Sequence, residues 1–119
     1  MRILVIDDSY VMRRIIKNIL ETIDDTYDIF ESENGGKCLD VLEEGEFDLI
    51  ILDIPFIEGL NALKNIKAKS NNAKIIICTM ESSKNYIMKA VKFGADEYIV
   101  KPFNKEVFKQ KMFKLKRLI

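Results

Sequence analysis

Five short apolar segments that alternate with segments of helical periodicity constrain the fold of this chain more than any other feature. The apolar segments are residues 3–6, 27–31, 48–52, 74–78 and 98–100. The first, third and fourth are almost continuously apolar and rich in β-branched side chains, which is typical of parallel strands covered by helices on both faces. The alternation therefore predicts an α/β fold of the (βα)5 type with a doubly wound, five-stranded parallel sheet.

Between these segments, apolar side chains recur at helical spacing, so each connection is expected to contain a helix with one buried stripe. The second helix should open after Gly36, and the fourth should run from about Ser83 to Gly94, a residue suited to a left-handed C-terminal cap. The stripe of the first helix should comprise Val11, Met12, Ile15, Ile16, Ile19, Leu20 and Ile23, with Arg13, Arg14, Lys17 and Asn18 on the opposite face. The other stripes should comprise Leu39 and Leu42, then Leu60, Leu63 and Ile66, then Ile87, Ala90 and Val91, and finally Phe108, Met112, Leu115 and Ile119.

Length and composition restrict the kind of protein further. The chain has 119 residues, of which 48% are hydrophobic and 32% charged, and these values fit one compact domain over residues 1–119. It contains no histidine and only two cysteines, which excludes disulfide frameworks, cysteine–histidine zinc sites and catalysis by a histidine base. Lysine plus arginine and aspartate plus glutamate both number 19, and this zero net charge argues against direct binding to nucleic acid. No apolar run approaches the ~20 residues of a membrane-spanning helix and no secretory signal is evident, so we expect a soluble protein without membrane insertion.

Polar side chains follow four of the five predicted strands at the point where each strand ends. They are Asp7 and Asp8, Asp53, Thr79, and the pair Lys101-Pro102. In an open parallel α/β sheet, ligands bind beyond the carboxyl ends of the strands near the switch point, and right-handed crossovers bring those ends to one edge. Three carboxylates, a hydroxyl and an ammonium group should therefore converge.

This set of side chains suits phosphoryl transfer to a carboxylate. Clustered carboxylates repel each other unless a cation neutralises them, and an all-oxygen site favours Mg²⁺ over zinc. A metal ion beside a nucleophilic aspartate polarises an incoming phosphoryl group, while a lysine and a hydroxyl hold its other oxygens. The alternative is that Asp7, Asp8 and Asp53 are only helix caps or turn residues, which is common for single aspartates. The matched set at several strand ends favours a site.

Four motifs, taken in order, resemble those of one protein family. They are Ile6-Asp7-Asp8-Ser9, Leu49-Ile50-Ile51-Leu52-Asp53, Ile77-Cys78-Thr79 and Tyr98-Ile99-Val100-Lys101-Pro102-Phe103. With these motifs, the whole chain resembles the receiver domains of two-component response regulators, especially the stand-alone chemotaxis type. The resemblance implies a flavodoxin-like, CheY-like sheet with the strand order 2-1-3-4-5.

The resemblance also implies a role for each residue of the site. Asp53 would be the phosphoacceptor, Asp7 and Asp8 the acidic pair that organises Mg²⁺ beside Asp53, Thr79 the switch hydroxyl, and Lys101 the ammonium bonded to the phosphoryl group. Tyr98 occupies the position of the family's rotameric switch aromatic, and a simple sheet-edge aromatic is the alternative. Lys101-Pro102 matches the position of a cis peptide bond in the family.

A receiver domain of this kind acts by binding other proteins. The resemblance implies that a histidine kinase or phosphotransfer protein donates the phosphoryl group to Asp53. The chain would phosphorylate and dephosphorylate itself without being a turnover enzyme, and a downstream protein target is expected on the face of the fourth helix, fifth strand and fifth helix. Such domains work beside kinases inside the cell, and two unpaired cysteines agree with a cytoplasmic location.

The segment after Asp53 departs from the family pattern. Gly59, which opens the third helix in the family, follows Asp53 after six positions, two fewer than usual. The missing residues remove up to ~7 Å of chain, so either the loop tightens or the helix starts later. The backbone carbonyl that the family uses as a metal ligand falls on Pro55, which restricts Ile54 to extended geometry. A second departure is Met80, whose long side chain is expected to narrow access to Asp53.

These departures leave a second functional hypothesis open, a pseudo-receiver that serves as a protein-binding scaffold with an impaired acceptor loop. Two further classes fit less well. A free-standing Mg²⁺ phosphatase with an aspartyl nucleophile would require an Asp-x-Asp motif after the first strand, where this chain has Asp7-Asp8-Ser9. A flavin-binding domain would require a phosphate-binding loop at the same place, and the acidic pair repels anions.

The fifth helix carries an asymmetric charge. Its basic residues are Lys105, Lys109, Lys111, Lys114, Lys116 and Arg117, against one acidic residue, Glu106. Either the lysine stems simply cover apolar surface on a solvated face, or the face attracts an acidic segment of a partner. The place of this helix in the family's output surface favours the second interpretation.

Overall fold

The computed structural model of the chain describes residues 1–53, 56–70 and 72–117, and within them five strands alternate with five helices. In chain order the elements are β1 (Arg2–Asp7), α1 (Tyr10–Ile23), β2 (Asp28–Ser32), α2 (Gly35–Glu43), β3 (Leu49–Asp53), α3 (Phe56–Lys69), β4 (Lys74–Thr79), α4 (Lys84–Lys92), β5 (Glu97–Val100) and α5 (Lys105–Lys116). The ends of each expected strand are shifted by at most one residue. Ile119, expected at the end of the last stripe, lies outside the described residues. In the part of the chain that is described, no helix combines the length and apolar character needed to cross a membrane.

All five strands are parallel and form one sheet in the order β2-β1-β3-β4-β5, which confirms the expected fold class and strand order. The chain steps away from β1 in both directions, so the switch point lies between β1 and β3. There the register pairs Asp7 with Asp53. These two residues and Thr79 end their strands one position later than expected, because each still pairs with a residue of a neighbouring strand.

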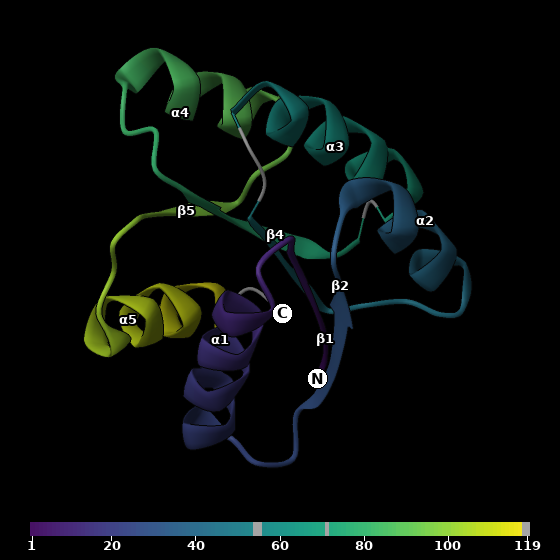
Figure 1. Ribbon diagram of the computed structural model, residues 1–119, viewed down its shortest axis with the longest axis vertical. Coiled ribbons are helices and arrows are strands. Elements are labelled where there is room, and N and C mark those ends of the chain that lie inside the picture. The colour runs from purple at the N-terminus through teal and green to yellow at the C-terminus, as the bar shows by residue number, and fades with distance from the viewer. Residues whose placement is uncertain (54–55, 71, 118–119) are drawn as a thin grey trace.

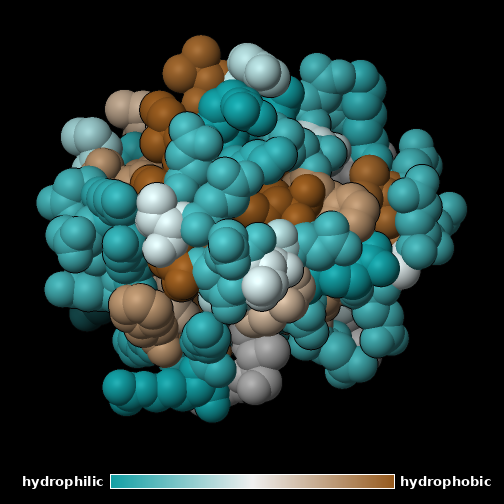
Figure 2. All heavy atoms as spheres, turned by 90° about the horizontal axis from the view of Figure 1, so that it is seen from below, coloured by the Kyte–Doolittle hydropathy of each residue, from teal (hydrophilic) through white to brown (hydrophobic). Residues whose placement is uncertain are grey.

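The helices cover the sheet on both sides: α1 and α5 lie on one face, and α2, α3 and α4 lie on the other (Figure 1). One apolar cluster joins Ile3, Val5, Ile51 and Ile76 to Ile16, Leu20, Phe108 and Met112, and the second joins Leu4, Ile6, Ile50 and Leu52 to Leu42, Leu63, Ile66 and Ala90. This two-sided burial explains why the central strands are apolar along their whole length. Seen from the side of α1 and α5, the surface is mostly hydrophilic, with smaller apolar areas between the polar side chains (Figure 2).

The buried stripe of α1 is narrower than the sequence predicts. Its buried side chains are Ile16, Ile19 and Leu20, whereas Val11 is 66% exposed and Ile15 is also exposed. The helix begins at the carboxyl edge of the sheet, directly after β1 ends, so its first turns have little of the sheet to pack against. Apolar side chains therefore remain at the surface next to the residues predicted to form the site.

Helix α4 also buries less than expected. It begins after the N-cap Ser83 and ends before Gly94, whose φ of +117° confirms the predicted left-handed cap. Its buried side chains are Tyr86 and Ala90, and Val91 is exposed against expectation. Successive residues of a helix are turned by ~100°, so Val91 falls outside the narrow stripe that Tyr86 and Ala90 define.

Two other helices begin earlier than expected. Asn34 is an N-cap whose side chain accepts a backbone hydrogen bond, so α2 begins at Gly35 and not after the glycine pair. Helix α3 begins at Phe56, before Gly59, so of the two alternatives given for the short segment after Asp53, a later start of this helix is wrong. Only residues 54–55, which lie outside the described residues, connect β3 to α3.

Candidate functional site

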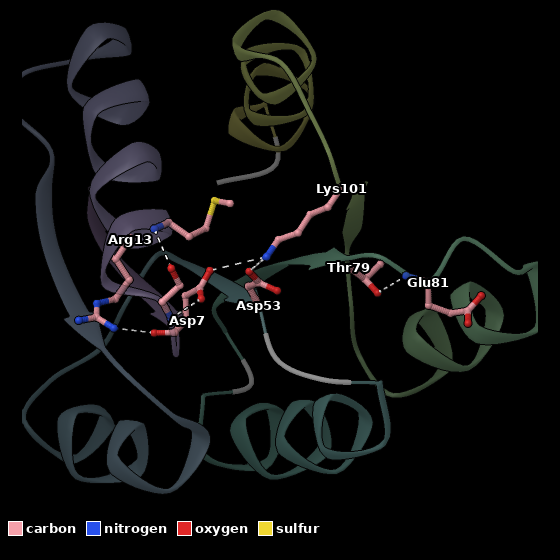
Figure 3. Close-up of polar contacts among 8 residues, drawn as sticks. Asp7, Arg13, Asp53, Thr79, Glu81 and Lys101 are labelled. Atoms are coloured by element: carbon pink, nitrogen blue, oxygen red, sulfur yellow. Dashed lines mark hydrogen bonds and ion pairs between the residues drawn. The ribbon is translucent and has the colours of Figure 1, made fainter.

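Three of the predicted site residues meet at the switch point of the sheet. Asp7 and Asp53 end the neighbouring strands β1 and β3, and both side chains are buried. Lys101 follows β5 and donates a hydrogen bond from Nζ to Asp53 Oδ2, while the same Nζ lies 3.9 Å from Asp7 Oδ2 (Figure 3). One ammonium group thus lies between two carboxylates, which offsets part of the cost of burying them.

Asp7 is held in place by its own loop and by α1. Its Oδ1 accepts a hydrogen bond from Ser9 N at 2.8 Å, and its backbone oxygen accepts one from Arg13 Nη1 at 2.7 Å. The other carboxylate oxygen, Oδ2, is buried and accepts no hydrogen bond from the residues that the structure describes. A buried carboxylate oxygen in this condition costs free energy unless a cation or a donor approaches it. The site therefore fits a hard divalent cation such as Mg²⁺, whose preferred ligands are carboxylate oxygens.

The remaining predicted metal ligands are not brought into the same group. The side chain of Asp8 is exposed at the end of β1. Among the residues that the structure describes, no cluster of three or more aspartate, glutamate, cysteine or histidine side chains could hold a metal ion. The carbonyl of Pro55 lies outside the described residues. Asp7 and Asp53 therefore converge as expected, and the third carboxylate of the predicted set stays apart from them.

Thr79 lies at the end of β4 with its hydroxyl turned away from Asp53. The side chain is buried, and Oγ1 accepts a hydrogen bond from Glu81 N at 2.9 Å. Figure 3 shows this hydroxyl directed toward Glu81 and not toward Asp53. Lys101 N donates to Thr79 O at 2.7 Å, which joins the ends of β4 and β5. The peptide bond between Lys101 and Pro102 is cis, as the sequence predicts.

Tyr98 is partly buried on β5 and contacts α5. The Nζ atom of Lys111 lies 4.5 Å from the centroid of the Tyr98 ring, a cation–π contact. Lys111 and Lys114 also form ion pairs with the carboxylate of Glu97, at 3.0 and 3.1 Å. Glu97 is only 6% exposed. Burial by itself would raise its pKa, but hydrogen bonds from Tyr98 N, Lys111 and Lys114 outweigh burial and lower the pKa of Glu97 below its usual value.

These ion pairs change the interpretation of the basic fifth helix. Glu97 belongs to β5, so a count of charges along the helix alone does not include it. Part of the positive charge of α5 is neutralised by this buried carboxylate, which Lys111 and Lys114 share. A smaller basic surface remains, and whether it binds an acidic segment stays a prediction.

Arg13 is a site residue that the sequence analysis placed on the solvent face of the first helix. Its Nε donates to Glu31 Oε1 at 3.2 Å while Nη1 donates to Asp7 O, so it ties α1 to the carboxyl ends of β1 and β2. The signal that could have revealed it is a basic residue one turn into a helix that follows an acidic strand end. Its partner Glu31 lies on a separate strand, and only the fold brings the two together.

Met80 borders an apolar groove beside the site. Its side chain is 79% exposed. The groove has a volume of about 270 Å³ and is lined by Met12, Ile15, Met80, Lys101, Pro102 and Phe103. Met80 thus lies close to the lysine that contacts Asp53, and its expected effect on access to Asp53 remains a prediction.

Cys78 precedes Thr79 in β4 and takes no part in nucleophilic chemistry. The thiol is fully enclosed, and burial, followed by the nearby charge of Asp7, raises the pKa of Cys78 to about 12. A thiol in such surroundings is almost entirely protonated at neutral pH and is inert. Cys78 is therefore excluded as a nucleophile at this edge.

Known proteins share this fold. Residues 3–113 match the family model described as the response regulator receiver domain. The chain is similar to chemotaxis protein CheY-3 of Vibrio cholerae, with 34% identity over 119 residues that cover 97% of this chain and 91% of that protein. It is similar to the crystal structure of a two-component response regulator from Clostridium difficile, with a TM-score of 0.87 and 25% identity over 98% of this chain and 96% of that chain. A response regulator from Burkholderia pseudomallei, crystallised with a phosphorylated aspartic acid, a calcium ion and citrate, has a TM-score of 0.80 and 28% identity over 92% of this chain and 65% of its own.

The fold and the paired carboxylates are those of a signalling phosphoacceptor. Within that class, the chain belongs to the receiver domains of response regulators, because the family match spans nearly all of it. Receiver domains accept phosphoryl groups in two-component signalling and bind Mg²⁺ at the phosphorylation site. Response regulators interact with histidine kinases and with downstream targets.

Proposed function

We propose that Asp53 is the phosphoacceptor of this chain and that its phosphorylation switches a protein-binding face. The observation that carries the proposal is the contact of Lys101 with Asp53 beside Asp7 Oδ2, a buried oxygen that accepts no hydrogen bond from the described residues. Together these groups form a nucleophile, a phosphoryl-binding cation and a metal-binding oxygen at one switch point. The proposed donor in the cell is a histidine kinase or phosphotransfer protein, because response regulators interact with histidine kinases.

The chemical step forms an acyl phosphate. A carboxylate oxygen of Asp53 attacks the phosphorus of the donor's phosphohistidine, the new O–P bond forms, and the N–P bond breaks with its electron pair returning to the imidazole. Lys101 lies where it can neutralise the phosphoryl oxygens as they arrive, and the hydroxyl of Thr79 can donate to them once it turns. The side chains of Asp7 and Asp53 would hold Mg²⁺ as the cofactor, and the ion, when bound, would supply charge neutralisation and polarise the phosphoryl group.

The surface around the site supports docking of a phosphodonor protein. Exposed apolar side chains lie near the ends of the strands that carry the site. They are Tyr10 and Val11 at the start of α1 and Met80 after β4, and Met80 also lines the apolar groove. Contiguous exposed apolar surface of this kind marks protein-binding sites in soluble proteins. A donor histidine that reaches Asp53 must cover this rim, so the donor is expected to present an apolar face around its histidine.

The output face is proposed on α4, β5 and α5. Met88 and Val91 are exposed on α4, and Lys109 on α5 is a charge for which the described residues show no ion pair. These features fit a protein target with an apolar surface and acidic side chains. We further propose that the chain acts as a single receiver domain over residues 1–119 in the cytoplasm, without turnover of a substrate and without direct contact to nucleic acid.

A pseudo-receiver is the second candidate, and one observation favours it. Only two residues connect Asp53 to α3, and the family's carbonyl ligand falls within them. If this loop cannot complete the metal site, the chain would bind partners without being phosphorylated.

Labelling with a small phosphodonor separates the two candidates. Purified protein is incubated with acetyl phosphate in Mg²⁺ buffer, and the mass of the intact protein is measured. We expect a gain of one phosphoryl group that depends on Mg²⁺ and that is abolished by EDTA. Asp53→Asn should abolish the gain and leave the fold intact, since it removes the nucleophile with hardly any change in volume. Unchanged labelling of Asp53→Asn would refute Asp53 as the acceptor, and absence of labelling in the unaltered protein would favour the pseudo-receiver.

A further inference from the structure

One arginine side chain contacts the ends of both β1 and β2 beside the site. Arg13 belongs to α1, and its side chain is only 14% exposed. Its Nη1 donates a hydrogen bond to the backbone oxygen of Asp7 at 2.7 Å (Figure 3), and its Nε donates to Glu31 Oε1 at 3.2 Å. The guanidinium carbon also lies 5.7 Å from the centroid of the Tyr10 ring. These three contacts restrict the guanidinium group to one position.

Asp7 is the residue that this arginine holds. The ladder between β1 and β2 ends with the pair Ile6 and Ser32, so Asp7 extends past the last pair with β2. There Arg13 donates a hydrogen bond to the backbone of Asp7, and Arg13 is itself held by Glu31 of β2. The arginine thus continues the connection between the two strands for one more residue.

The direction of the Asp7 carboxylate depends on this backbone contact. Its Oδ1 accepts a hydrogen bond from Ser9 N at 2.8 Å, which leaves Oδ2 as the oxygen that accepts none from the described residues. The side chain is short and one of its oxygens is already held, so the position of Oδ2 follows that of the Asp7 backbone. Mg²⁺ demands near-ideal octahedral geometry, and a small displacement of a ligand oxygen therefore weakens its binding.

We propose that Arg13 is a positioning residue for the metal site and that, together with Glu31, it sets the affinity of Asp7 for Mg²⁺. The inference rests on one part of the proposed function, the binding of Mg²⁺ by Asp7 and Asp53, and requires no phosphorylation. Without the hydrogen bond from Arg13, the last residue of β1 loses its anchor to α1 and can shift. Glu31 contributes as well, because it neutralises a positive charge that would otherwise oppose a nearby cation.

Loss of Arg13 alone would have two opposite effects on a cation. Loss of its charge favours Mg²⁺, whereas loss of its hydrogen bond to Asp7 weakens the site. The double variant Arg13→Met with Glu31→Gln separates these effects, because it removes the hydrogen bond and leaves the summed charge of the pair at zero. Arg14→Met is the matched control, since Arg14 is the next residue of α1, is exposed and forms no ion pair among the described residues.

Calorimetric titration with Mg²⁺, well below the unfolding temperature, measures the affinity of the folded protein directly. We expect the double variant to bind Mg²⁺ about tenfold more weakly than the unaltered protein, a typical effect of removing a contact that supports a metal ligand. In ~0.1 M salt, Arg14→Met should change the affinity by less than about twofold, because an exposed charge is largely screened. Labelling of the double variant with acetyl phosphate should reach the same maximal rate, but at about tenfold higher Mg²⁺.

An arginine with a merely structural role would lower stability in metal-free buffer and leave the Mg²⁺ affinity of the folded protein unchanged. An affinity of the double variant within about twofold of that of the unaltered protein, or tighter than it, would therefore overturn this inference. If Mg²⁺ binding depends on Arg13 but no labelling occurs, the inference holds and the proposed phosphoacceptor is refuted. If the unaltered protein binds no Mg²⁺, both are overturned.

Discussion

The carboxyl edge of the sheet has two halves that are prepared for function to different degrees. In the half formed by β1, β3 and β5, the side chains of Asp7, Asp53 and Lys101 already lie together. In the half formed by β4 and α4, the hydroxyl of Thr79 accepts a hydrogen bond from Glu81 N and points away from Asp53. We call these the prepared half and the held half. If Asp53 is the phosphoacceptor, as we propose, the groups that would accept the phosphoryl group already lie together before phosphorylation. The hydroxyl of Thr79, by contrast, must turn before it can contact that group.

The forces in the two halves differ in size. The buried charges in the prepared half stabilise one another. Removing one partner from a buried ion pair typically lowers the free energy of unfolding by about 3–5 kcal/mol. The held half uses neutral hydrogen bonds, each of which contributes about 1 kcal/mol. A covalent modification at Asp53 can therefore exchange the bonds of Thr79 without unfolding the charged group beside it. The predictions below test this contrast.

The largest effect is expected from Lys101→Met in the prepared half. It leaves two buried carboxylates without their ammonium group, so the free energy of unfolding in metal-free buffer should fall by about 3 kcal/mol. Mg²⁺ should restore part of this loss, because it binds the folded state. Urea denaturation with and without Mg²⁺ measures both effects. Lys105→Met, at an exposed lysine on α5, is the control and should change stability by less than about 0.5 kcal/mol. A stability of Lys101→Met equal to that of the unaltered protein would show that the carboxylates do not depend on this lysine.

The loop after Asp53 tests how complete the prepared half is. Insertion of two glycines before Pro55 restores the usual spacing of the family. If the short loop displaces a metal-ligating carbonyl, the insertion should increase Mg²⁺ affinity and the rate of acetyl phosphate labelling by about tenfold, a typical effect of one supporting contact at a metal site. The same insertion after Ser70, at the other end of α3, should have no effect on labelling. Equal rates for all three proteins would mean that the loop is adequate as it stands.

Glu97 tests whether the surroundings of Tyr98 also hold charge in place. Its pKa is lower in the folded protein than its ordinary value of 4.5, so its contribution to stability is present above pH 4.5 and is lost as the pH falls through the lowered pKa. Glu97→Gln should lose about 1 kcal/mol at pH 7 and show a flatter acid limb in urea denaturation below pH 4.5. Glu106→Gln, on the exposed first turn of α5, serves as the control. An acid limb of Glu97→Gln as steep as that of the unaltered protein would contradict this assignment.

The smallest expected change is at Cys78, which lies in β4 beneath Thr79. With its pKa raised to about 12, only about one thiol in 10⁴ is ionised at pH 8, and the side chain is enclosed as well. In a Cys38→Ser background, a thiol reagent at pH 8 should therefore leave the folded protein unmodified and react fully in urea. Beryllofluoride, a stable mimic of the aspartyl phosphoryl group, should not alter this protection, because the proposed turn of Thr79 toward Asp53 requires no opening of β4. Rapid modification of the folded protein would show that the held half opens more widely than we describe.

The sequence was sufficient to predict the prepared half but not the held half. Asp7, Asp53 and Lys101 each directly follow an apolar strand, and the topology of a parallel sheet brings such positions to one edge. Thr79 could be predicted by the same rule, but the direction of its hydroxyl depends on hydrogen bonds with its neighbours. The burial of Tyr86 depends on how deeply α4 packs against the sheet, which helical periodicity does not determine.

Other differences have the same origin. Arg13 and the lysines of the fifth helix are assigned from the helices on which they lie, whereas their partners Glu31 and Glu97 lie on strands. Val11 and Ile15 fit an apolar stripe by spacing but lie where α1 begins at the edge of the sheet. Periodicity describes a helix in isolation, and burial depends on where the neighbouring strands stop.

The register that pairs Asp7 with Asp53 also has a mechanical meaning. The two residues are the last pair of the ladder between the central strands β1 and β3, so a divalent ion bound to both carboxylates would link the strands at their ends. Parallel strands pulled in opposite directions slide past one another only after such a link breaks. Binding of the ion would thus make the centre of the sheet stiffer against shear. The same ion that assists phosphoryl transfer would cross-link β1 and β3 at their ends.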